Sequence, residues 1–469
     1  MRLPPAQQPL NISSYMKGRE MKPLISRHSD HYENALLDRT YNARRPSRRP
    51  AGILLAQTEQ DVVQGVRLAR RNGWKVSIRT SGHSFASWPL QDDALLIDVK
   101  GLRELSYDDE SQLAQAGPGV LGGTELRPFL ARFGRFVPTG HHHTVGLGGY
   151  LLCGGHAWNT RGFGWTAEYV VGVDVVTADG KLLHANESQN SDLYWAARGA
   201  GPAFPGIVVR YHLRTRCLPG HIAHSTQIYP MELYDQVMPW LIRDHRNLGL
   251  SVEVLAFRFL GHHLVPGHTG NLLVVTALSF ADTAEQAAAD LAPLESSPAL
   301  DEAFVHIIAD PTSIERYTTE IIEDPEPAEY GAVRIAADNA WINATPEETA
   351  SLLRPAFFDL VSPQALVFWT GFAPLRRLPD MAFDLHGENY FVIALMWGNE
   401  TEDERLLQWR DQRMRELDHV TIGQFVAEVD QNKSNLHYMS EANRERLSKI
   451  IHYYDPHDVF SRPLSEHCP

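Results

Sequence analysis

The first hydrophobic pattern along the chain predicts a strand, a helix and a second strand. Residues 53–56 (ILLA) form a short apolar run, which is typical of a buried strand. Over residues 59–72, apolar side chains recur at the spacing of one helix face, with acidic residues in the first turn and Gly73 after the last. Residues 74–79 then alternate between apolar and polar side chains, as in a half-buried strand.

Similar patterns continue to about residue 218. A helix is expected over residues 125–133, where the apolar side chains share one face. Asp179-Gly180 lies between two strand-like runs and predicts a hairpin turn. The strands expected in this region span residues 94–98, 112–116, 169–176, 181–184 and 207–215.

After Pro219-Gly220 the pattern changes to longer strands interleaved with helices. One sheet with helices packed on a face would bury the apolar side chains of both the strands and the helices, so we predict an α+β domain in this half of the chain. The expected strands span residues 222–229, 250–259, 271–280, 366–370 and 390–397. The expected helices span residues 231–243, 284–291, 346–353 and 402–417.

Composition narrows the class of protein. The chain has 469 residues, 43% hydrophobic and 21% charged, which is typical of a soluble globular protein with two or three domains. A net charge of −14 argues against a nucleic-acid-binding protein and gives no support for binding anionic membranes. Cys153, Cys217 and Cys468 are too widely spaced for a disulfide framework or a zinc C-x-x-C pair. Without a secretory signal or a long apolar run, a cytoplasmic protein is expected.

The strongest candidate chemistry lies in residues 79–84 (RTSGHS), directly after the second strand. Small residues in a turn let backbone N–H groups point outward together, and such a cluster binds phosphate oxygens. The imidazole of His83 is a base, a nucleophile and a metal ligand. Three hypotheses follow for His83: a turn residue without a role, a metal ligand, or a residue beside a phosphate-bearing cofactor.

Residues 140–155 (GHHHTVGLGGYLLCGG) are dense in glycine, which marks backbone close to a ligand or to another backbone. The spacing fits neither a Rossmann fingerprint nor a P-loop, and a tight connection between strands is the alternative. The run His141–His143 is a weak metal hypothesis, because neighbouring strand residues point to opposite faces. Lining of an active site, or packing, remains open for these histidines.

Together these motifs resemble those of FAD-linked oxidoreductases of the vanillyl-alcohol-oxidase (PCMH) type, and most closely the berberine-bridge-enzyme-like branch. The resemblance covers about residues 50–218 and resumes near Asn443. Residues 79–84 resemble the family's R-S-G-G-H-S/D loop, and residues 145–164 resemble its glycine-rich segment. Further motifs that match lie at residues 173–181, 192–207, 443–447 and 454–460.

The resemblance implies an α+β fold with a two-part FAD-binding PCMH-type domain and an inserted α+β substrate domain, an antiparallel sheet covered by helices. The implied divisions are an N-terminal arm at 1–45, the FAD domain at 46–218, the substrate domain at 219–420, and a C-terminal berberine-bridge-like segment at 421–469 that returns to the FAD domain.

The cofactor implied by the resemblance is FAD, linked covalently through its 8α-methyl group to His83. In many relatives a cysteine makes a second link, but the aligned position here is His142, so we predict a single link. The turn with Gly148 and Gly149 is expected to hold the diphosphate. The implied cofactor-binding residues are Arg79, Thr80, Ser81, Gly82, His83, Ser84, Val145, Gly146, Gly148, Gly149, Gly154, Gly206, Ile207, Val209 and Asn443.

The catalytic base is less defined. Many relatives carry a C-terminal Y-x-N-Y motif, of which this chain keeps Asn443 and has Glu441 in place of the first tyrosine. Candidates are Glu441, Tyr150, His142 and His143, each with surface exposure or packing as the alternative.

The implied function is an FAD-dependent oxidase that takes a hydride from a small organic substrate, with O2 reduced to hydrogen peroxide. Val145 occupies the family's gatekeeper position and resembles the oxygen-reactive members. The lack of a secretory signal and the single link favour a substrate from secondary metabolism. The alternatives are a dehydrogenase on the same fold, a flavin-free binding protein, and a zinc or copper hydrolase built on the histidine run. The substrate, the base and the oligomeric state are left open by the sequence.

Overall fold

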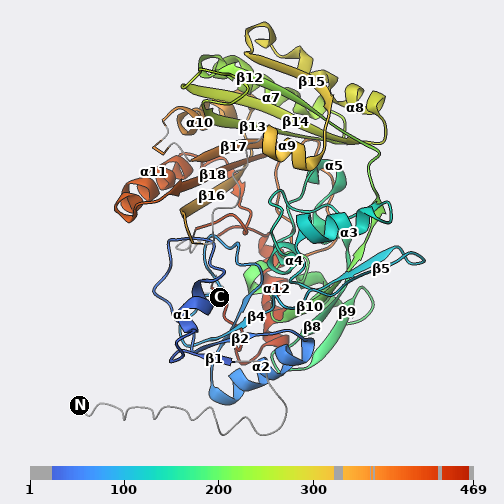
Figure 1. Cartoon of the computed structure of the whole chain (residues 1–469), viewed down its shortest axis with the longest axis vertical. Helices are drawn as coiled ribbons and strands as arrows, with labels where there is room; N and C mark the ends of the chain where they lie inside the picture. The colour runs from blue at the N-terminus through green and yellow to red at the C-terminus, as the bar shows by residue number, and fades with distance from the viewer. Residues whose placement is uncertain (1–23, 322–330, 360, 363–364, 431–435, 464–469) are drawn as a thin grey trace.

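The computed structural model describes residues 24–321, 331–359, 361–362, 365–430 and 436–463. Within these ranges, two sheets of moderate size lie in the lower part of the molecule and one large sheet lies in the upper part (Figure 1). A short ladder between β7 (Arg135–Phe136) and β11 (Arg216–Cys217) lies beside them. None of the helices in the described part of the chain is long and apolar enough to cross a membrane.

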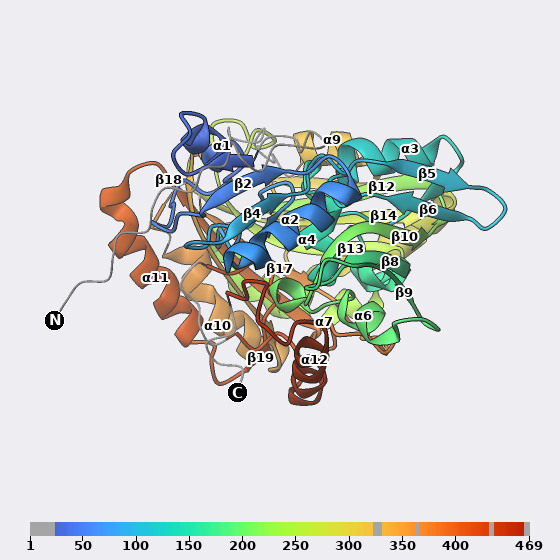
Figure 2. The same ribbon diagram turned by 90° about the horizontal axis from the view of Figure 1, so that it is seen from below.

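The first sheet contains, in spatial order, β1 (Leu24–Ser26), β2 (Gly52–Leu55), β4 (Leu95–Asp98) and β3 (Val76–Arg79). Strands β2, β4 and β3 run parallel, and β1 is antiparallel to β2. Helix α2 (Glu59–Asn72) packs its apolar stripe on this sheet (Figures 1 and 2). It begins at a capping box made by Thr58 and ends at Gly73 in the left-handed conformation, as its sequence predicts.

The second sheet is antiparallel, in the order β5 (Leu105–Asp108), β6 (Leu113–Ala116), β10 (Ile207–Arg214), β8 (Val170–Val176) and β9 (Leu182–Asn186). Its apolar core includes residues of three short helices, α3 (Arg127–Ala131), α4 (Leu147–Leu152) and α6 (Ser191–Ala196). Residues of the C-terminal helix α12 (Glu441–Tyr454) belong to the same core. Helix α5 (Thr160–Phe163) follows α4 in the chain.

The large sheet is antiparallel throughout, in the order β15 (Val305–Pro311), β12 (His221–Pro230), β14 (Asn271–Ala281), β13 (Val252–Leu260), β17 (Leu366–Gly371), β18 (Asn389–Trp397), β16 (Arg334–Ile342) and β19 (Thr421–Gly423). Four helices bury apolar residues in one core with this sheet: α7 (Tyr234–Asp244), α8 (Ala284–Leu291), α10 (Pro346–Phe358) and α11 (Asp403–Arg415).

Alternation along β13 separates the two faces of the large sheet. Val252, Val254 and Ala256 belong to the core shared with the four helices. Leu255 and Phe257 belong to a second cluster, and they share their face with Glu253 because side chains two apart point the same way. Helix α9 (Ile314–Glu320) contributes Tyr317 and its neighbours to a further cluster, in which Leu278 and Phe280 of β14 also lie.

After the large sheet, the chain returns to the first sheet. Helix α12 (Glu441–Tyr454) contacts α6, and the backbone then runs beside β3. There the N–H of Val76 donates to the carbonyl of Val459 at 2.7 Å, and that of Ser461 donates to the carbonyl of Val76 at 2.8 Å. The predicted fold class, a two-part cofactor domain with an inserted antiparallel domain covered by helices, is confirmed.

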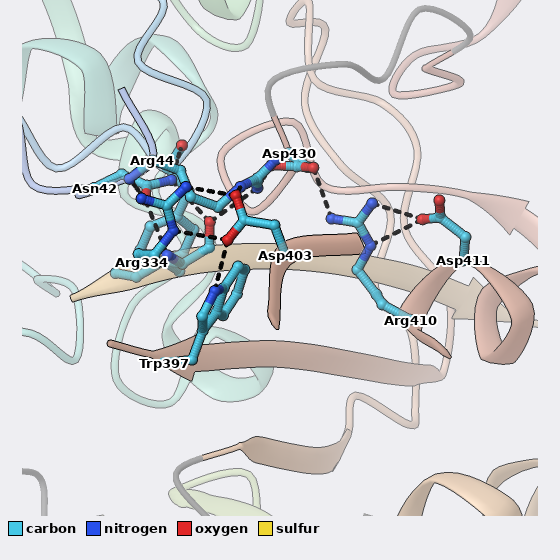
Figure 3. Close-up of polar contacts among 10 residues, drawn as sticks. Asn42, Arg44, Arg334, Trp397, Asp403, Arg410, Asp411 and Asp430 are labelled. Atoms are coloured by element: carbon cyan, nitrogen blue, oxygen red, sulfur yellow. Dashed lines mark hydrogen bonds and ion pairs between the residues drawn. The ribbon is translucent and has the colours of Figure 1, made fainter. Parts of the chain in front are cut away.

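The N-terminal segment also joins the two parts of the molecule (Figure 3). The side-chain amide of Asn42 donates to the carbonyl of Ile335 in β16 at 2.8 Å and accepts from the N–H of the same residue at 2.9 Å. The buried guanidinium of Arg44 pairs with the buried carboxylate of Asp430 at 2.7 Å, and Arg410 of α11 pairs with the same carboxylate at 2.8 Å. Residues 24–45 are therefore part of the packed body.

Most predicted elements are present with small shifts in their ends, including α2, α8 and the β8–β9 hairpin. The helix predicted over residues 125–133 is present with different ends: it begins as a wide π-helical turn at Gly122–Leu126 and continues as the short α3, and Phe133 lies beyond it and is exposed. Strands β15 and β16 and helix α4 were not predicted. Of the cysteines, Cys153 is buried, Cys217 is exposed, both are unpaired, and Cys468 lies outside the described residues.

Candidate active site

Buried charge fixes the turn that follows β3. Arg79, the last residue of β3, is 2% exposed, and its guanidinium pairs with Asp98 at 2.8 Å and donates to the carbonyl of Leu36 at 2.8 Å. Gly82 has a φ of +86°, and a Cβ atom there would lie 2.1 Å from the carbonyl oxygen of Arg39. Glycine is required at this position because the conformation disfavours other residues and no space is left. Arg79 therefore supports the turn from the interior.

The glycine-rich segment lies directly against this turn. The N–H of Gly146 donates to Ser81 Oγ at 2.9 Å. A Cβ atom on Gly148 would lie 2.6 Å from Thr80 Oγ1, so the backbone there approaches the turn closely. Gly149, in the first turn of α4, is exposed and has nothing within 4 Å of its Cβ position. Two motifs that are far apart in the sequence thus form one surface with open space beside it.

His83 lies at the end of this surface, among aromatic side chains. Its ring stacks on Tyr41 with centroids 4.9 Å apart, and its Nε2 is 2.9 Å from Thr144 Oγ1. The ring of His142 is 4.8 Å away and stacks in turn on His143, 5.1 Å away and nearly parallel. Burial, and then the neighbouring His142, lower the pKa of His83 to about 3. Burial and His143 lower the pKa of His142 to about 4. Both His83 and His142 are therefore neutral at pH 7.

The residues at this place fit a flavin nucleotide. The buried His142 Nε2 has no hydrogen-bond partner among the described residues, which is costly unless a ligand supplies one. The open space at Gly149 adjoins a turn of small residues that suits a diphosphate. A neutral imidazole at position 83 is in the protonation state that a nucleophile requires.

For four other predicted cofactor residues, the structure shows backbone conformation or packing. Gly154 has a φ of +104°, and Gly206 approaches Val175 so closely that a Cβ atom would lie 2.6 Å from its Cγ1. Ile207 and Val209 are buried in β10 in the core shared with α2. Ser84 and Val145 make backbone hydrogen bonds. The carbonyl of Ser84 accepts from the N–H of Ser87 at 3.2 Å, and the carbonyl of Val145 accepts from the N–H of Gly122 at 3.0 Å.

Tyr150 is engaged in the interior. Its hydroxyl lies 2.6 Å from Thr166 Oγ1, which is itself 2.9 Å from the carbonyl of Pro138 and 3.1 Å from that of Gly155. Since the single proton of Thr166 goes to one of those carbonyls, Tyr150 is the donor to Thr166. Burial also raises the pKa of Tyr150. These features disfavour a tyrosinate base at this position.

The C-terminal candidates lie on α12. Glu441 is the first residue of the helix and is exposed, so its carboxylate complements the helix dipole at the surface. The side chain of Asn443 donates to the carbonyls of Met381 and Ala382 at 3.0 and 3.2 Å. Asn443 therefore joins α12 to the segment before β18.

A second polar cluster, which the sequence did not predict, lies between the two parts of the molecule. His141 Nε2 is 2.9 Å from Oε1 of Glu253 in β13, and the rings of His141 and His156 are 5.0 Å apart. We call these three residues the His-Glu-His cluster. Glu253 and His156 are buried, with 4% and 8% of their surface exposed. No motif connects these residues in sequence, so only the fold could bring them together.

Two groups in the described residues bring histidine and carboxylate atoms within 4.8 Å of one another: the His-Glu-His cluster, and Asp174 with His184 and His212 on the second sheet. Neither group contains His142 or His143. Residues 141–143 form a bend and turn instead of a strand, so the expected alternation of their side chains is absent. The rings of His142 and His143 stack on each other, and His141 lies in the His-Glu-His cluster.

Comparison with known proteins identifies relatives along the whole chain. Residues 50–186 match the family described as an FAD binding domain. The FAD-linked oxidoreductase nodO of Hypoxylon pulicicidum is 34% identical over 431 residues, which are 91% of this chain and 93% of that protein. The FAD-linked oxidoreductase ptmO of Penicillium ochrochloron is 34% identical over 434 residues, 92% and 93% of the two chains. (R)-6-Hydroxynicotine oxidase of Paenarthrobacter nicotinovorans is 30% identical over 48% of this chain and 50% of its own.

Solved structures share the fold. The structure of 6-hydroxy-D-nicotine oxidase from Arthrobacter nicotinovorans superposes with a TM-score of 0.80 at 19% identity, covering 94% of this chain and 97% of that one. BBE-like 1 from Physcomitrella patens superposes with a TM-score of 0.79 at 18% identity, covering 95% and 97%. Wild-type Phl p 4.0202, described as a glucose dehydrogenase, has a TM-score of 0.78 at 19% identity, covering 94% and 96%.

Proposed function

This chain belongs to the family of FAD-linked oxidoreductases with the berberine-bridge-enzyme-like fold, and on that premise we propose that it is an oxidase whose FAD is attached covalently to His83. The membership makes it an FAD-dependent oxidoreductase, since identity of 34% extends over 91% of the chain. The oxidase activity and the covalent bond are the two parts of the proposal. The observation that carries the covalent bond is the neutral, partly buried His83 beside the contact of the two cofactor-binding motifs. The oxidase activity rests on Val145 at the gatekeeper position.

In this proposal the chain holds FAD mainly through its backbone. The Thr80–Ser84 turn and the N–H of Gly149 bind the diphosphate, and the open space at Gly149 supports that role. The N–H of Gly148 is donated to the carbonyl of Pro118 at 3.0 Å, so Gly148 contributes the close approach of its backbone to the turn. Backbone around Gly206, Ile207 and Val209 binds the adenine. Bound FAD would supply the hydride-accepting chemistry: the hydride and proton lost by the substrate would together reduce O2 to hydrogen peroxide.

A single covalent link is proposed because His142 stands where many relatives have the second linking cysteine. An imidazole at this position, neutral and 4.8 Å from the ring of His83, provides a hydrogen-bonding nitrogen beside the cofactor. Its buried Nε2, which lacks a protein partner among the described residues, supports a contact with the flavin at that atom.

Oxidase is favoured over dehydrogenase by Val145 at the gatekeeper position. The names of the relatives include both activities: (R)-6-hydroxynicotine oxidase and glucooligosaccharide oxidase on one side, and glucose dehydrogenase on the other. We propose a small organic substrate of secondary metabolism, in agreement with a single flavin link. A dehydrogenase on the same fold is the second candidate.

Denaturing gel electrophoresis tests the covalent bond. The purified wild-type protein should give a band that fluoresces under ultraviolet light after acid treatment, and the His83→Ala variant should give none. A yellow wild-type protein that releases its flavin on denaturation would contradict the link. A colourless wild-type protein would favour a flavin-free binding protein.

Oxygen use is tested with the same preparation. A panel of small alcohols and amines is incubated under air, and peroxide is measured. Peroxide in proportion to product is expected for an oxidase. Product formation that depends on an added dye, without peroxide, would instead identify a dehydrogenase.

A further inference from the structure

We propose that the His-Glu-His cluster (His141, His156 and Glu253) is the recognition site for a hydroxyl or amine group of the organic substrate. This inference rests on the proposed function, because the cluster becomes a substrate site only beside a bound flavin. It specifies the class of substrate: a molecule with an uncharged hydrogen-bond donor next to the carbon that is oxidised.

The cluster is assembled from both parts of the molecule. Glu253 extends from the middle of the large sheet, on the face opposite the four covering helices. His141 comes from the segment before α4 and His156 from the segment after it. His141 directly precedes His142, whose ring is 4.8 Å from that of His83. One residue of the cluster is therefore bonded directly to a residue whose ring contacts the proposed point of flavin attachment.

Two polar atoms of the cluster lack a hydrogen-bond partner. Glu253 Oε1 is paired with His141 at 2.9 Å, but the buried Oε2 has no partner among the described residues. The buried Nε2 of His156 likewise has none. Burying such atoms unpaired is costly, and native proteins normally supply a partner. One O–H or N–H group between these two atoms would satisfy the carboxylate and could also be held by the imidazole.

The protonation state of the cluster favours a donor as its ligand. Burial, and then the adjacent His141, lower the pKa of His156 well below its usual value, so this imidazole is neutral and offers no charge to an anion. Glu253 presents an oxygen that accepts hydrogen bonds. An alcohol or amine complements this arrangement, and a carboxylate or phosphate ligand does not.

The surroundings of the cluster favour an organic ligand. The ring of His141 lies 4.4 Å from that of Trp158, and the ring of His156 lies 5.5 Å from Phe372 and 5.7 Å from Tyr390. Aromatic walls with a few polar groups are typical of small-molecule sites. A divalent metal is a poorer occupant, because His141 and Glu253 already satisfy each other and the walls offer few further ligands.

The nearby carboxylate of Glu428 does not compete for this role. Its Oε2 accepts from the hydroxyl of Tyr390 at 2.6 Å, and burial raises its pKa. Glu253, by contrast, has a buried oxygen, Oε2, without a hydrogen-bond partner among the described residues.

The test is binding of 4-methoxyphenol to the flavin-loaded enzyme, followed through the visible absorption of the flavin. The probe carries one O–H donor, and 1,4-dimethoxybenzene serves as its matched ether without a donor. We expect the phenol to bind the wild type at least about tenfold more tightly than the ether. The Glu253→Gln variant places an NH2 donor on a side chain that offered acceptor oxygens, so it should weaken the phenol by about 10- to 100-fold and leave the ether unchanged.

A control variant and a second variant of the cluster separate loss of the recognition site from general damage to the protein. Glu445→Gln, an exposed carboxylate on α12, should change neither affinity. His156→Phe, which suits the aromatic walls, should also weaken the phenol, and it replaces Glu253→Gln if that variant does not fold. Equal binding of phenol and ether, an unchanged phenol affinity in both variants, or one equivalent of a divalent metal retained by the purified wild type would overturn the inference. A wild type without flavin would instead contradict the proposed function.

Discussion

At the scale of single residues, burial decides the chemistry of the candidate site. His83 and His142 are ordinary histidines in the sequence, but their environment lowers the pKa of both far below the usual range. A neutral imidazole lies in the protonation state of a nucleophile, and this property connects the local structure to the proposed flavin bond.

The first prediction concerns the pH dependence of flavin attachment. Because the pKa of His83 is about 3, its imidazole stays neutral at about pH 5, whereas a histidine of ordinary pKa would be mostly protonated. Flavin-free protein, produced under riboflavin limitation, should bind added FAD covalently at rates that differ by less than about twofold between about pH 8 and pH 5. An ordinary pKa near 6.5 would give about a 30-fold fall. Gel fluorescence measures the rate.

The same shift has a consequence for the stability of the flavin-free protein. A histidine with a depressed pKa binds fewer protons when folded than when unfolded. The stability that depends on neutral His83 is therefore complete above about pH 6.5 and is lost as the pH falls toward 3. A flavin-free wild type whose acid sensitivity in this range equals that of His83→Ala would contradict this reasoning.

The second prediction concerns Gly82. Gly82→Ala combines a left-handed conformation with a Cβ atom 2.1 Å from the carbonyl oxygen of Arg39. Gly73→Ala is a matched control, since Gly73 has a φ of +67° but nothing within 4 Å of its Cβ position. The control should lose about 1–2 kcal/mol of unfolding free energy, from strain alone. Gly82→Ala should lose at least about 2 kcal/mol more and retain little flavin. Equal losses in urea denaturation would disprove the steric account.

At the scale of elements, the Thr80–Ser84 turn, here called the cofactor turn, depends on ion pairs that join β3, β4 and the residues just after α1 (Tyr32–Leu37). Asp98, 2% exposed at the end of β4, pairs with both Arg79 and Arg39 at 2.8 Å. Arg79 also donates to the carbonyls at the end of α1. Three segments that meet at the base of the turn are thus connected through one carboxylate.

The third prediction tests that connection. Asp98→Asn removes the carboxylate that the buried Arg79 and Arg39 share. Arg39 then keeps the pair with the more exposed Asp38, at 3.1 Å. Removing one partner of a buried pair typically costs about 3–5 kcal/mol. Asp93→Asn is the control, because Asp93 pairs with Arg27 at 2.9 Å while 79% of its side chain is exposed. The control should change the unfolding free energy by less than about 1 kcal/mol. Comparable losses in both variants would show that burial is not the deciding factor.

At the scale of the whole molecule, segments near both ends of the chain connect the lower sheets to the large sheet. Arg44, from the N-terminal segment, and Arg410, from α11, share the carboxylate of Asp430 (Figure 3). The C-terminal segment separately returns to β3. The relative placement of the cofactor turn and the large sheet, which forms the His-Glu-His cluster, depends on these joints.

The fourth prediction concerns this joint. Asp430→Asn should cost about 3–5 kcal/mol of unfolding free energy, because it removes the buried counter-charge that Arg44 and Arg410 share. Arg44 then keeps the longer pair with Asp403, at 3.9 Å. It should also accelerate limited proteolysis of the N-terminal segment. Asp411→Asn is the control, since Asp411 also pairs with Arg410 but is 45% exposed. A variant at Asp430 as stable and protease-resistant as the control would exclude a structural role for the joint.

The sequence by itself determined the cofactor motifs, the fold family and most of the elements. Periodicity identified α2 and the β8–β9 hairpin because their signals are local: a capping box at Thr58, and a turn at Asp179-Gly180. It missed β16 because that strand is almost wholly buried and contains polar residues such as Asp338 and Asn339, so that it shows no alternation. Helix α4 was missed because glycines hide a helix whose stability comes from packing.

Only the tertiary structure decided which residues of the candidate site meet. It brings Gly146 to Ser81 and His142 to His83, as the motifs indicate, but it also shows Tyr150 engaged with Thr166 and Glu441 exposed on α12. The His-Glu-His cluster had no signal in the sequence, because His141 and Glu253 are 112 positions apart and no local pattern records a contact across such a distance. The protonation state of His83 likewise depends on burial, which exists only in the folded chain.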